Sequence, residues 1–216
     1  MLPAQSGPLS RRRVILVTGP SGAGKSRLSR RMNAAHGWPV VRLDDFYREH
    51  HDPGLPLSDL GIPDWDHPDS WNAAAAVEAL RCLVDTGRAE VPVYDISRSE
   101  VAGTHTVTAD AGHYVLAEGL FAARLVEPLL AEGLLADALC VCHNRWITFL
   151  RRLIRDLAER RKPPHILLRR GWALLRQEPQ IIADAARHGA RAIHPRAAES
   201  YLSQLVEANE STESAA

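Results

Sequence analysis

The sequence predicts an α/β fold built on a doubly wound, mainly parallel sheet. Short runs rich in apolar and β-branched residues recur along the chain and alternate with segments of helical periodicity. The four strongest runs are RVILVTG, WPVVRLDD, HYVLAEG and DALCVCHN. Because ligands bind such sheets at the carboxyl ends of the strands, the polar residues that follow each run are the first candidates for a functional site.

The first half of the chain gives a clear order of elements. A strand in RVILVTG precedes a helix in KSRLSRRMNAA and a second buried strand in WPVVRLDD. Residues 50–69 are rich in Pro, Asp and Gly, which predicts a loop long enough to serve a function. An Ala-rich helix from Ser70 to about Asp85 follows, and Gly87 ends it.

The second half begins with AEVPVYDI and THTVTA, which alternate like the two arms of a hairpin. The two later core strands are separated by a helix from Leu120 to about Ala131. After Asn144 we expect a long Arg-rich helix, a break at Pro163 and Pro164, two more helical stretches, a short strand in ARAIH and a final helix.

The length of 216 residues suits one domain with one good core. We expect a disordered N-terminal tail at 1–12, a single domain at 13–208 with a lid at about 145–165, and a disordered C-terminal tail at 209–216.

Composition excludes several classes of partner. Lys+Arg and Asp+Glu both number 26, so no global field draws the chain to nucleic acid or to a membrane. The 3 cysteines are too few for a disulfide framework, and the apolar stretch Val14–Val17 is too short for a signal sequence or a span. We therefore expect reduced thiols and a cytoplasmic protein; a homo-oligomer stays open.

The segment VTGPSGAGKS fits the phosphate-binding loop pattern G-x-x-x-x-G-K-[ST]. In such a loop, backbone N–H groups converge on a triphosphate at the N-terminus of a helix. Lys25 then reaches the β- and γ-phosphates, and the hydroxyl of Ser26 reaches Mg²⁺. The pattern predicts ATP and Mg²⁺ as cofactors and a P-loop NTPase fold. The predicted nucleotide-binding residues here are Gly19, Ser21, Gly22, Ala23, Gly24, Lys25, Ser26 and Arg27.

Acidic residues follow two of the predicted strands. Phosphoryl transfer needs a carboxylate near the acceptor hydroxyl and a second group on the metal. Asp44 and Asp45 end the second strand, so one of them can orient or deprotonate a hydroxyl; capping of a helix is the alternative. Glu118 ends HYVLAEG, where an acid can hold Mg²⁺, although Glu-Gly is also an ordinary turn.

Positive charge for the migrating phosphate comes from RWITFLRRLIRDLAERRKPP. Arg152 and Arg155 are three residues apart and share one face of the predicted helix. Beside a P-loop, a mobile lid that closes over the γ-phosphate is the favoured interpretation. A solvated helix face or an RNA-binding stripe is the alternative.

With these residues in place, the chain resembles the uridine kinase family of P-loop nucleoside kinases, relatives of phosphoribulokinase and bacterial pantothenate kinase. The resemblance runs from about Val14 to Lys162 and rests on motifs in the family's order. They are GPSGAGKS, LDDFYR at 43–48, DWDHPDSW at 64–71, VPVYD at 91–95, AEG at 117–119 and RRLIRDLAER at 151–160.

The resemblance implies a role for each residue of the acceptor site. Asp44 is the catalytic base, and Tyr47 is a wall of the nucleoside pocket. Trp65 is an aromatic neighbour of the base, Asp66 binds the ribose hydroxyls, and Tyr94 contacts the base.

It also implies roles in phosphate binding. Arg152 and Arg155 contact sugar and phosphate, and Arg160 and Lys162 fall on basic positions of the lid, Arg160 toward the nucleotide. The implied metal ligands are Ser26, Asp44 and Glu118, and the implied catalytic residues are Asp44, Lys25 and Arg155.

Three features depart from the family pattern. Ser99 stands where the family has a His that hydrogen-bonds the pyrimidine, so the reader of the base edge is missing or displaced. Arg161 replaces a glycine of the lid, which removes backbone freedom there. Residues 163–200 keep only a faint likeness to the region near which the family binds adenine, and ATP and GTP both stay open as donors.

We therefore expect an ATP- and Mg²⁺-dependent kinase that acts on the 5′-hydroxyl of a nucleoside, uridine or cytidine first. One alternative is a kinase for another small alcohol, of the pantothenate or sugar-phosphate type. Another is a nucleotide-binding regulatory protein that has lost turnover. An RNA-binding module lacks the interleaved aromatics and the basic net charge that it would need.

Overall fold

A computed structural model describes residues 12–59, 61–109, 114–147, 149–150, 154 and 164–213. At its centre is a parallel sheet with the strand order β2-β5-β1-β6-β7. Its strands are β1 (Arg13–Thr18), β2 (Val40–Arg42), β5 (Tyr114–Glu118), β6 (Leu135–Val141) and β7 (Arg191–Ile193). The parallel, doubly wound sheet predicted from the sequence is confirmed.

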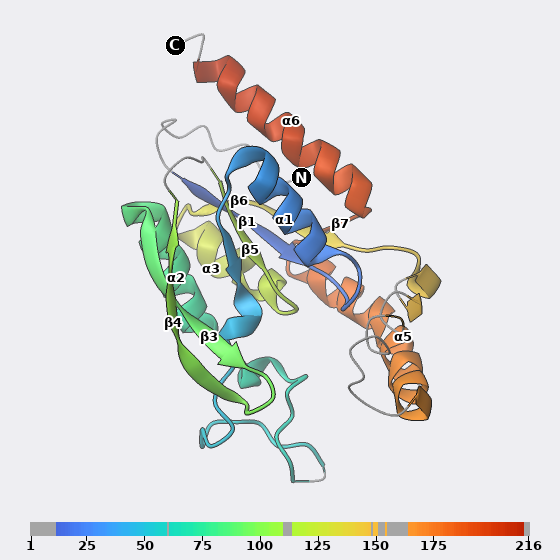
Figure 1. The fold of residues 1–216 in the computed structure, drawn as a ribbon. Helices are drawn as coiled ribbons and strands as arrows, with labels where there is room; N and C mark the ends of the chain where they lie inside the picture. The colour runs from blue at the N-terminus through green and yellow to red at the C-terminus, as the bar shows by residue number, and fades with distance from the viewer. Residues whose placement is uncertain are drawn as a thin grey trace.

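Helices cover both faces of this sheet (Figure 1). One face carries α1 (Lys25–His36) and α6 (Pro195–Glu213), and the other carries α2 (Ala73–Thr86), the 3₁₀ turn η3 (Ala122–Leu125) and α3 (Val126–Ala131). No helix in these described ranges is long and apolar enough to cross a membrane.

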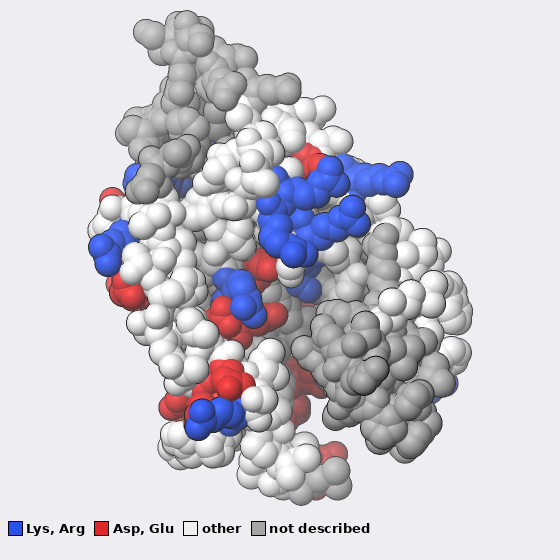
Figure 2. Space-filling view, viewed as in Figure 1, with Lys and Arg blue, Asp and Glu red and all other residues white. Residues whose placement is uncertain are grey.

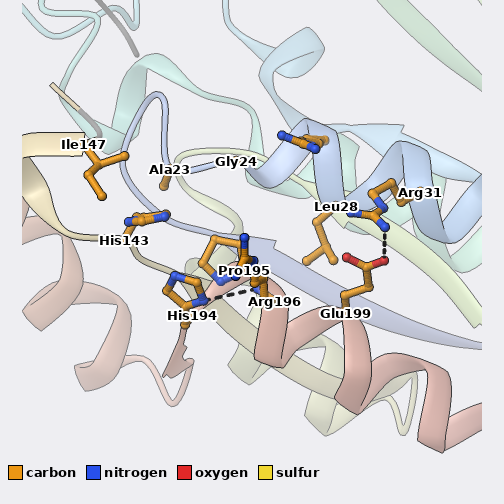
Figure 3. A pocket seen from close by; sticks show the side chains of 11 residues that line it. Ala23, Gly24, Leu28, Arg31, His143, Ile147, His194, Pro195, Arg196 and Glu199 are labelled. Atoms are coloured by element: carbon orange, nitrogen blue, oxygen red, sulfur yellow. Dashed lines mark hydrogen bonds and ion pairs between the residues drawn. The ribbon is translucent and has the colours of Figure 1, made fainter. Parts of the chain in front are cut away.

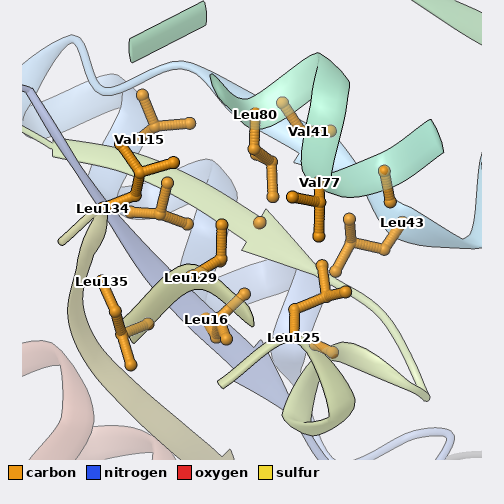
Figure 4. Close-up of a cluster of buried hydrophobic side chains, with 14 of the residues drawn as sticks. Leu16, Val41, Leu43, Val77, Leu80, Val115, Leu125, Leu129, Leu134 and Leu135 are labelled. Carbon is orange, nitrogen blue, oxygen red and sulfur yellow. The ribbon is translucent and has the colours of Figure 1, made fainter. Parts of the chain in front are cut away.

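The core follows from the alternation of side chains along the strands. Ile15 and Val17 of β1 pack with Leu28 of α1 and Leu202 of α6. Leu16 of β1 joins the second cluster, in which helix α2 and the segment around α3 meet the sheet (Figure 4). Both clusters exclude solvent, which explains why β1 reads as an unbroken apolar run.

A two-stranded antiparallel hairpin, β3 (Arg88–Asp95) and β4 (Glu100–Thr108), forms a second sheet beside α2, as the sequence predicted. Its tip is joined to the loop that follows β2. The Tyr94 hydroxyl donates to the carbonyl of Arg48 at 2.8 Å, and the amide of His50 donates to the carbonyl of Ser99 at 2.8 Å. The hairpin is thereby held to that loop.

Two boundaries differ from those predicted. Strand β2 ends at Arg42, and the acids that were expected at its end lie in a 3₁₀ turn, η1 (Leu43–Phe46). The Leu43 carbonyl does not continue the strand, because it accepts a hydrogen bond from the Trp71 indole N–H at 2.6 Å. Helix α2 begins at Ala73, three residues late, because the Asn72 side chain accepts from Ala75 N and so caps it.

The C-terminal part differs more. Helix α5 (Pro164–Arg187) begins at the predicted proline break but is one helix, with Pro179 inside, where two stretches were expected. Leu175 and Ala185, on either side of that proline, are both buried, so packing offsets the lost backbone hydrogen bond. Helix α6 runs to Glu213, into the segment 209–216 that was expected as a tail.

Candidate active site

The P-loop connects β1 to α1, and its glycines are required by geometry. Gly19 has φ +135°, and a Cβ there would lie 2.2 Å from the carbonyl oxygen of Val141 at the end of β6. Gly24, at φ +107°, caps α1 in a left-handed conformation, so the helix begins at Lys25. The N-terminus of a 12-residue helix therefore faces the loop, which is the arrangement that binds phosphate.

Lys25 lies folded over the loop. Its Nζ donates to the carbonyl of Gly19 at 2.7 Å and to that of Pro20 at 3.3 Å. These carbonyls hold the ammonium group at the mouth of the loop, within the same cavity as the acids of the site.

A central cavity of about 350 Å³ brings together the predicted phosphate, metal and base residues. Its walls come from the P-loop, from η1 and from the turn after β5. The residues that line it are Ser21, Gly22, Gly24, Lys25, Ser26, Arg27, Asp44, Tyr47, Glu118, Gly119 and Leu120.

Asp44 is fixed in this cavity by the turn after β5. Its Oδ1 accepts from the amide of Leu120 at 3.1 Å. A Cβ on Gly119 would lie 2.8 Å from the Leu43 Cβ and 3.0 Å from Asp44 Oδ1, so only glycine allows η1 to come this close. The AEG motif thus serves both the acid that precedes the glycine and the acid across from it.

Asp45 points elsewhere. It is 5% exposed and pairs with Arg42 at 3.6 Å. Burial raises its pKa above the ordinary value, which the Arg42 charge and a hydrogen bond from the Tyr94 backbone partly offset. Of the two acids that the sequence left as alternatives, Asp44 is the one that lines the central cavity.

Glu118 is a buried acid whose charge calls for a cation. It is 7% exposed, and its Oε2 has no hydrogen-bond partner in the described part of the chain. Burial raises its pKa, while a hydrogen bond with Ser26 and the charge of Lys25 act in the opposite direction. A buried carboxylate oxygen beside a serine hydroxyl and a phosphate-binding loop fits Mg²⁺, which prefers one or two carboxylates together with phosphate and water oxygens.

This fit does not depend on a cage of protein ligands. Among the described ranges there is no group of three or more His, Cys, Asp or Glu that could hold a metal ion. The predicted ligands Ser26, Asp44 and Glu118 share one cavity, so they suit an ion that arrives with a nucleotide.

An aromatic cluster flanks the central cavity. The Tyr47 ring lies 6.2 Å from Trp65, 5.9 Å from Tyr94 and 6.2 Å from Phe121. Burial raises the pKa of the Tyr47 phenol, and the nearby acids raise it further. The three predicted aromatic residues are thus brought together, and Phe121, which the sequence did not single out, joins them.

Asp66 lies in a neighbouring cavity of about 460 Å³, which we call the α5 cavity. It shares Ser21 and Leu120 with the central cavity, so the two are contiguous. The α5 cavity is lined by Thr18, Ser21, Asp66, Pro68, Leu120, Phe121, Ala123, Arg124, Gln177, Gln180, Ile181, Asp184, Ala185 and Arg187.

A third cavity, of about 400 Å³, opens on the other side of the P-loop, between α1 and the start of α6 (Figure 3). The imidazoles of His143 and His194 are in contact there, with ring centroids 4.6 Å apart and ring planes tilted by 60°. Arg31 pairs with Glu199 at 2.7 Å on the far wall. We call it the histidine cavity; it shares Gly24 and Arg27 with the central cavity.

This side of the molecule is basic. Figure 2 shows Lys and Arg side chains gathered over α1, on the face that the figure presents. Arg27, Arg31 and Arg196 line the histidine cavity, where Glu199 is the one acidic residue among the lining side chains described. Such a surface favours an anionic ligand even though the chain as a whole has no net charge.

Sequence reasoning missed both histidines. Yet His143 comes two residues after β6, and His194 directly follows β7. Both therefore lie at the carboxyl edge of the parallel sheet, and the rule that ligands bind at this edge would have found them.

The predicted lid residues Arg152, Arg155, Arg160 and Lys162, with Arg161, lie outside the described residues. Their roles stay predictions.

Comparison with known proteins agrees with this geometry. The profile of the Phosphoribulokinase / Uridine kinase family matches residues 14–164. The uridine kinase of Ligilactobacillus salivarius (strain UCC118) is 28% identical over 150 residues, which are 68% of this chain and 68% of that protein. The uridine kinase of Deinococcus deserti (strain DSM 17065 / CIP 109153 / LMG 22923 / VCD115) is 29% identical over 163 residues, 72% of this chain and 73% of that protein.

Solved structures share the fold. A crystal structure from Silicibacter sp. TM1040, described as a "putative fructose transport system kinase", superposes with a TM-score of 0.59 at 19% identity, covering 85% of this chain and 88% of that one. The P-loop, the acids Asp44 and Glu118 beside it and the family match over most of the chain agree with one another. The chain is a P-loop kinase that belongs to the phosphoribulokinase / uridine kinase family.

Proposed function

We propose that this kinase transfers the γ-phosphoryl group of ATP to the 5′-hydroxyl of a nucleoside, uridine or cytidine first. The observation that supports it most is the central cavity, where Lys25, Ser26, Asp44 and Glu118 meet beside the aromatic cluster around Tyr47. Relatives named uridine kinase, which are similar over about two thirds of the chain, support the nucleoside as acceptor.

The donor occupies the P-loop. Its phosphates lie against the loop amides at the start of α1, where Lys25 exchanges the carbonyls of Gly19 and Pro20 for phosphate oxygens. Its base and ribose extend into the histidine cavity, where the imidazoles of His143 and His194 offer flat faces for stacking.

Ser26 and Glu118 are the residues that would hold Mg²⁺, because both line the central cavity at the edge of the loop. When bound, Mg²⁺ neutralises charge on the phosphates. Glu118 in turn gains a cation for an oxygen that lacks a hydrogen-bond partner among the described residues.

The acceptor enters from the opposite side, against Tyr47 and Asp66. Asp44 accepts the proton of the acceptor hydroxyl, whose oxygen attacks the γ-phosphorus while the bond to the bridging oxygen of ADP breaks. The amide of Leu120 holds the Asp44 carboxylate in place for this step. By the family resemblance, Arg152, Arg155 and Arg160 add positive charge from the lid.

A coupled assay of ADP release over uridine, cytidine, adenosine, guanosine, pantothenate and a set of sugars and sugar phosphates tests the proposal. We expect turnover with nucleosides and a 5′-monophosphate as product. Lys25→Ala is the inactive control, because the loop keeps its amides but loses the charge on the migrating phosphate. Turnover with pantothenate or a sugar alone would refute the nucleoside assignment, and ATP binding without any turnover would favour a regulatory protein.

A further inference from the structure

Thr18 is a buried polar residue at the end of β1 whose hydroxyl reaches the turn after β5. It is 1% exposed, and its Oγ1 donates to the carbonyl of Leu120 at 2.9 Å. Thr18 immediately precedes Gly19, the first glycine of the P-loop, so it lies outside the phosphate-binding pattern itself. The motifs that identify the candidate site therefore leave this hydroxyl without an assigned role.

The hydrogen bond lies where the backbone pairing between β1 and β5 ends. Val17 and Glu118 are the last pair in the register of these strands, and the amide of Gly119 still donates to the carbonyl of Val17 at 3.2 Å. One residue later the two segments separate, because one continues into the P-loop and the other turns toward η3. The Thr18 hydroxyl binds the Leu120 carbonyl at this point, so a side-chain hydrogen bond connects the two segments where backbone bonds no longer do.

Leu120 is thereby held from two sides. Its carbonyl accepts from Thr18, and its amide donates to Asp44 Oδ1 at 3.1 Å. A side chain at the end of β1 is thus connected, through one residue, to the acid of η1 that the proposed function assigns as the general base. Without the Thr18 hydroxyl, Leu120 loses an anchor, and the amide that binds the Asp44 carboxylate is less firmly fixed.

The orientation of this amide bears on the reaction rate. The Trp71 indole fixes the Leu43 carbonyl and the small Gly119 lets η1 come close, so both act on the backbone around Asp44. The hydrogen bond from Leu120 reaches the carboxylate itself. A general base has to lie within hydrogen-bond distance of the proton that it accepts, and a small displacement from that geometry lowers the rate.

Packing alone does not call for a hydroxyl at position 18. The four preceding residues of the strand, Val14–Val17, are aliphatic and fully buried, and valine has nearly the shape of threonine. A buried hydroxyl loses its hydration, and its hydrogen bond has to offset that loss. Thr18 also borders the α5 cavity, but its single hydroxyl proton is given to Leu120. The contact therefore points to the turn that carries Leu120 as the reason for the hydroxyl.

We propose that Thr18 is a positioning residue for the general base and acts on Asp44 through Leu120. The proposal rests on the proposed function, because it takes Asp44 as the group that accepts the proton of the acceptor hydroxyl. It holds for any acceptor alcohol, since every group in the connection belongs to the protein. The end of β1 then supports both reacting partners: the Gly19 carbonyl holds the Lys25 ammonium group, and Thr18 holds the turn that aims the base.

The test is a double-mutant cycle of Thr18→Val and Asp44→Asn. kcat, KM for ATP and the melting temperature are measured for the wild type, both single variants and the double variant, with the acceptor that the coupled assay identifies. Thr18→Ser keeps the hydroxyl on a smaller side chain, and Thr18→Ala takes the place of Thr18→Val if that protein does not fold. Thr86→Val is the matched control, because the Thr86 hydroxyl also donates to a backbone carbonyl at 2.8 Å but lies at the end of α2 and lines none of the three cavities.

We expect Thr18→Val to lower kcat roughly 3- to 10-fold, the size of one neutral hydrogen bond, with an unchanged KM for ATP. Thr18→Ser should recover most of the rate, and Thr86→Val should match the wild type. In the Asp44→Asn background, Thr18→Val should not lower kcat further, because the group that it positions is already absent. A purely structural role would instead lower kcat by the same factor in both backgrounds.

A wild-type kcat in Thr18→Val, or an equal loss in the two backgrounds, would overturn the inference and leave the proposed function intact. An Asp44→Asn protein with undiminished kcat would overturn the choice of Asp44 as the base, and the inference with it. A wild type that acts only on another alcohol would overturn the nucleoside assignment alone, since the cycle is then measured with that acceptor and its outcomes keep their meaning.

Discussion

Asp44 and Asp45 are neighbours in sequence with opposite environments. Asp44 lines the central cavity and accepts from the amide of Leu120, whereas Asp45 is buried against Arg42 and the Tyr94 backbone. One carboxylate can meet a substrate hydroxyl and the other can only support the turn. Substitution of each acid should therefore have a different effect on the kinase rate.

Asp44→Asn is expected to lower kcat by roughly 10²- to 10⁴-fold with the fold and ATP binding intact, because a positioned general base is removed while its shape remains. Asp45→Asn is the matched variant and should keep kcat within a few-fold. Rate assays and ATP titrations on both proteins check this. If Asp45→Asn carried the large loss, the base would have been assigned to the wrong acid.

The buried Glu118 carboxylate, which the proposed function requires, is expected to lower the free energy of unfolding. Its pKa is raised by burial, so the folded state resists ionisation. At a pH below the pKa of Glu118 in the unfolded state, the carboxyl is protonated in both states and does not lower the free energy of unfolding. As the pH rises toward and beyond the pKa in the folded state, the loss of free energy of unfolding grows to its full value. Glu118→Gln should therefore melt higher than the wild type at pH 7, with the difference vanishing near pH 4.

Glu118→Gln should also lose kinase activity. Addition of Mg²⁺ and ATP should raise its melting temperature by less than it raises that of the wild type. Thermal melts with and without Mg²⁺ and ATP measure both effects. An equal gain in the two proteins would show that Glu118 does not hold the ion.

For single residues, the sequence predicted well which side chains belong to the candidate site and poorly what surrounds each of them. The GKS motif and the strand-terminal position identified Lys25, Ser26 and Glu118, because backbone geometry at these places depends on local sequence. Which acid of the Asp pair faces the cavity depends instead on Trp71 and Gly119, both distant in sequence. No local pattern carries that information.

By the family resemblance, the hairpin β3–β4 departs from the family's pattern at one position, Ser99. Ser99, in its turn, has φ +54° and offers a hydroxyl to Tyr94, whose own hydroxyl donates to the Arg48 carbonyl. Both hydroxyls are therefore engaged with protein groups. The aromatic cluster around Tyr47 then offers ring faces on which the base of an acceptor can stack. It offers few hydrogen-bond partners for the edge of that base.

We expect weaker discrimination between uridine and cytidine than a hydrogen-bonding histidine would give, since stacking recognises a flat ring and not its edge. Ser99→His should sharpen the choice for pyrimidines, because His tolerates the left-handed conformation and reaches further than Ser. The measurement is kcat/KM for uridine, cytidine, adenosine and guanosine in both proteins. Strict pyrimidine selectivity in the wild type, unchanged in the variant, would contradict this.

Periodicity predicted the strands and the hairpin because each is buried or paired in the ordinary way. It failed for α5, where two helical stretches were expected and the structure has one helix with Pro179 inside it, because packing around Leu175 and Ala185 outweighs the local cost of the proline.

Across the whole molecule, the site depends on helices that pack on opposite faces of the sheet. Helix α6 carries Pro195, Arg196 and Glu199 into the histidine cavity, and Leu202 anchors it against β1 and α1. The packing of a single buried leucine therefore links domain stability to the proposed donor site.

Leu202→Ala should lower the free energy of unfolding by about 2–5 kcal/mol, the usual cost of truncating a fully buried leucine. KM for ATP should rise as α6 loosens. Gln204→Ala, two residues away on the exposed face, should change neither. Denaturant unfolding and ATP titration test the pair, and a Leu202→Ala protein as stable as the wild type would contradict the packing described here.

The three contiguous cavities have a consequence for kinetic order. Gly24 and Arg27 connect the histidine cavity to the central one, and Ser21 and Leu120 connect the central cavity to the α5 cavity. On the proposed assignment, the donor and the acceptor occupy separate cavities that meet over the P-loop, so both can be bound at once and no phosphoenzyme is needed to carry the phosphoryl group between them. Initial-rate lines at several fixed acceptor concentrations should intersect, as in a ternary-complex mechanism, whereas parallel lines would mean that the group rests on the protein between two half-reactions.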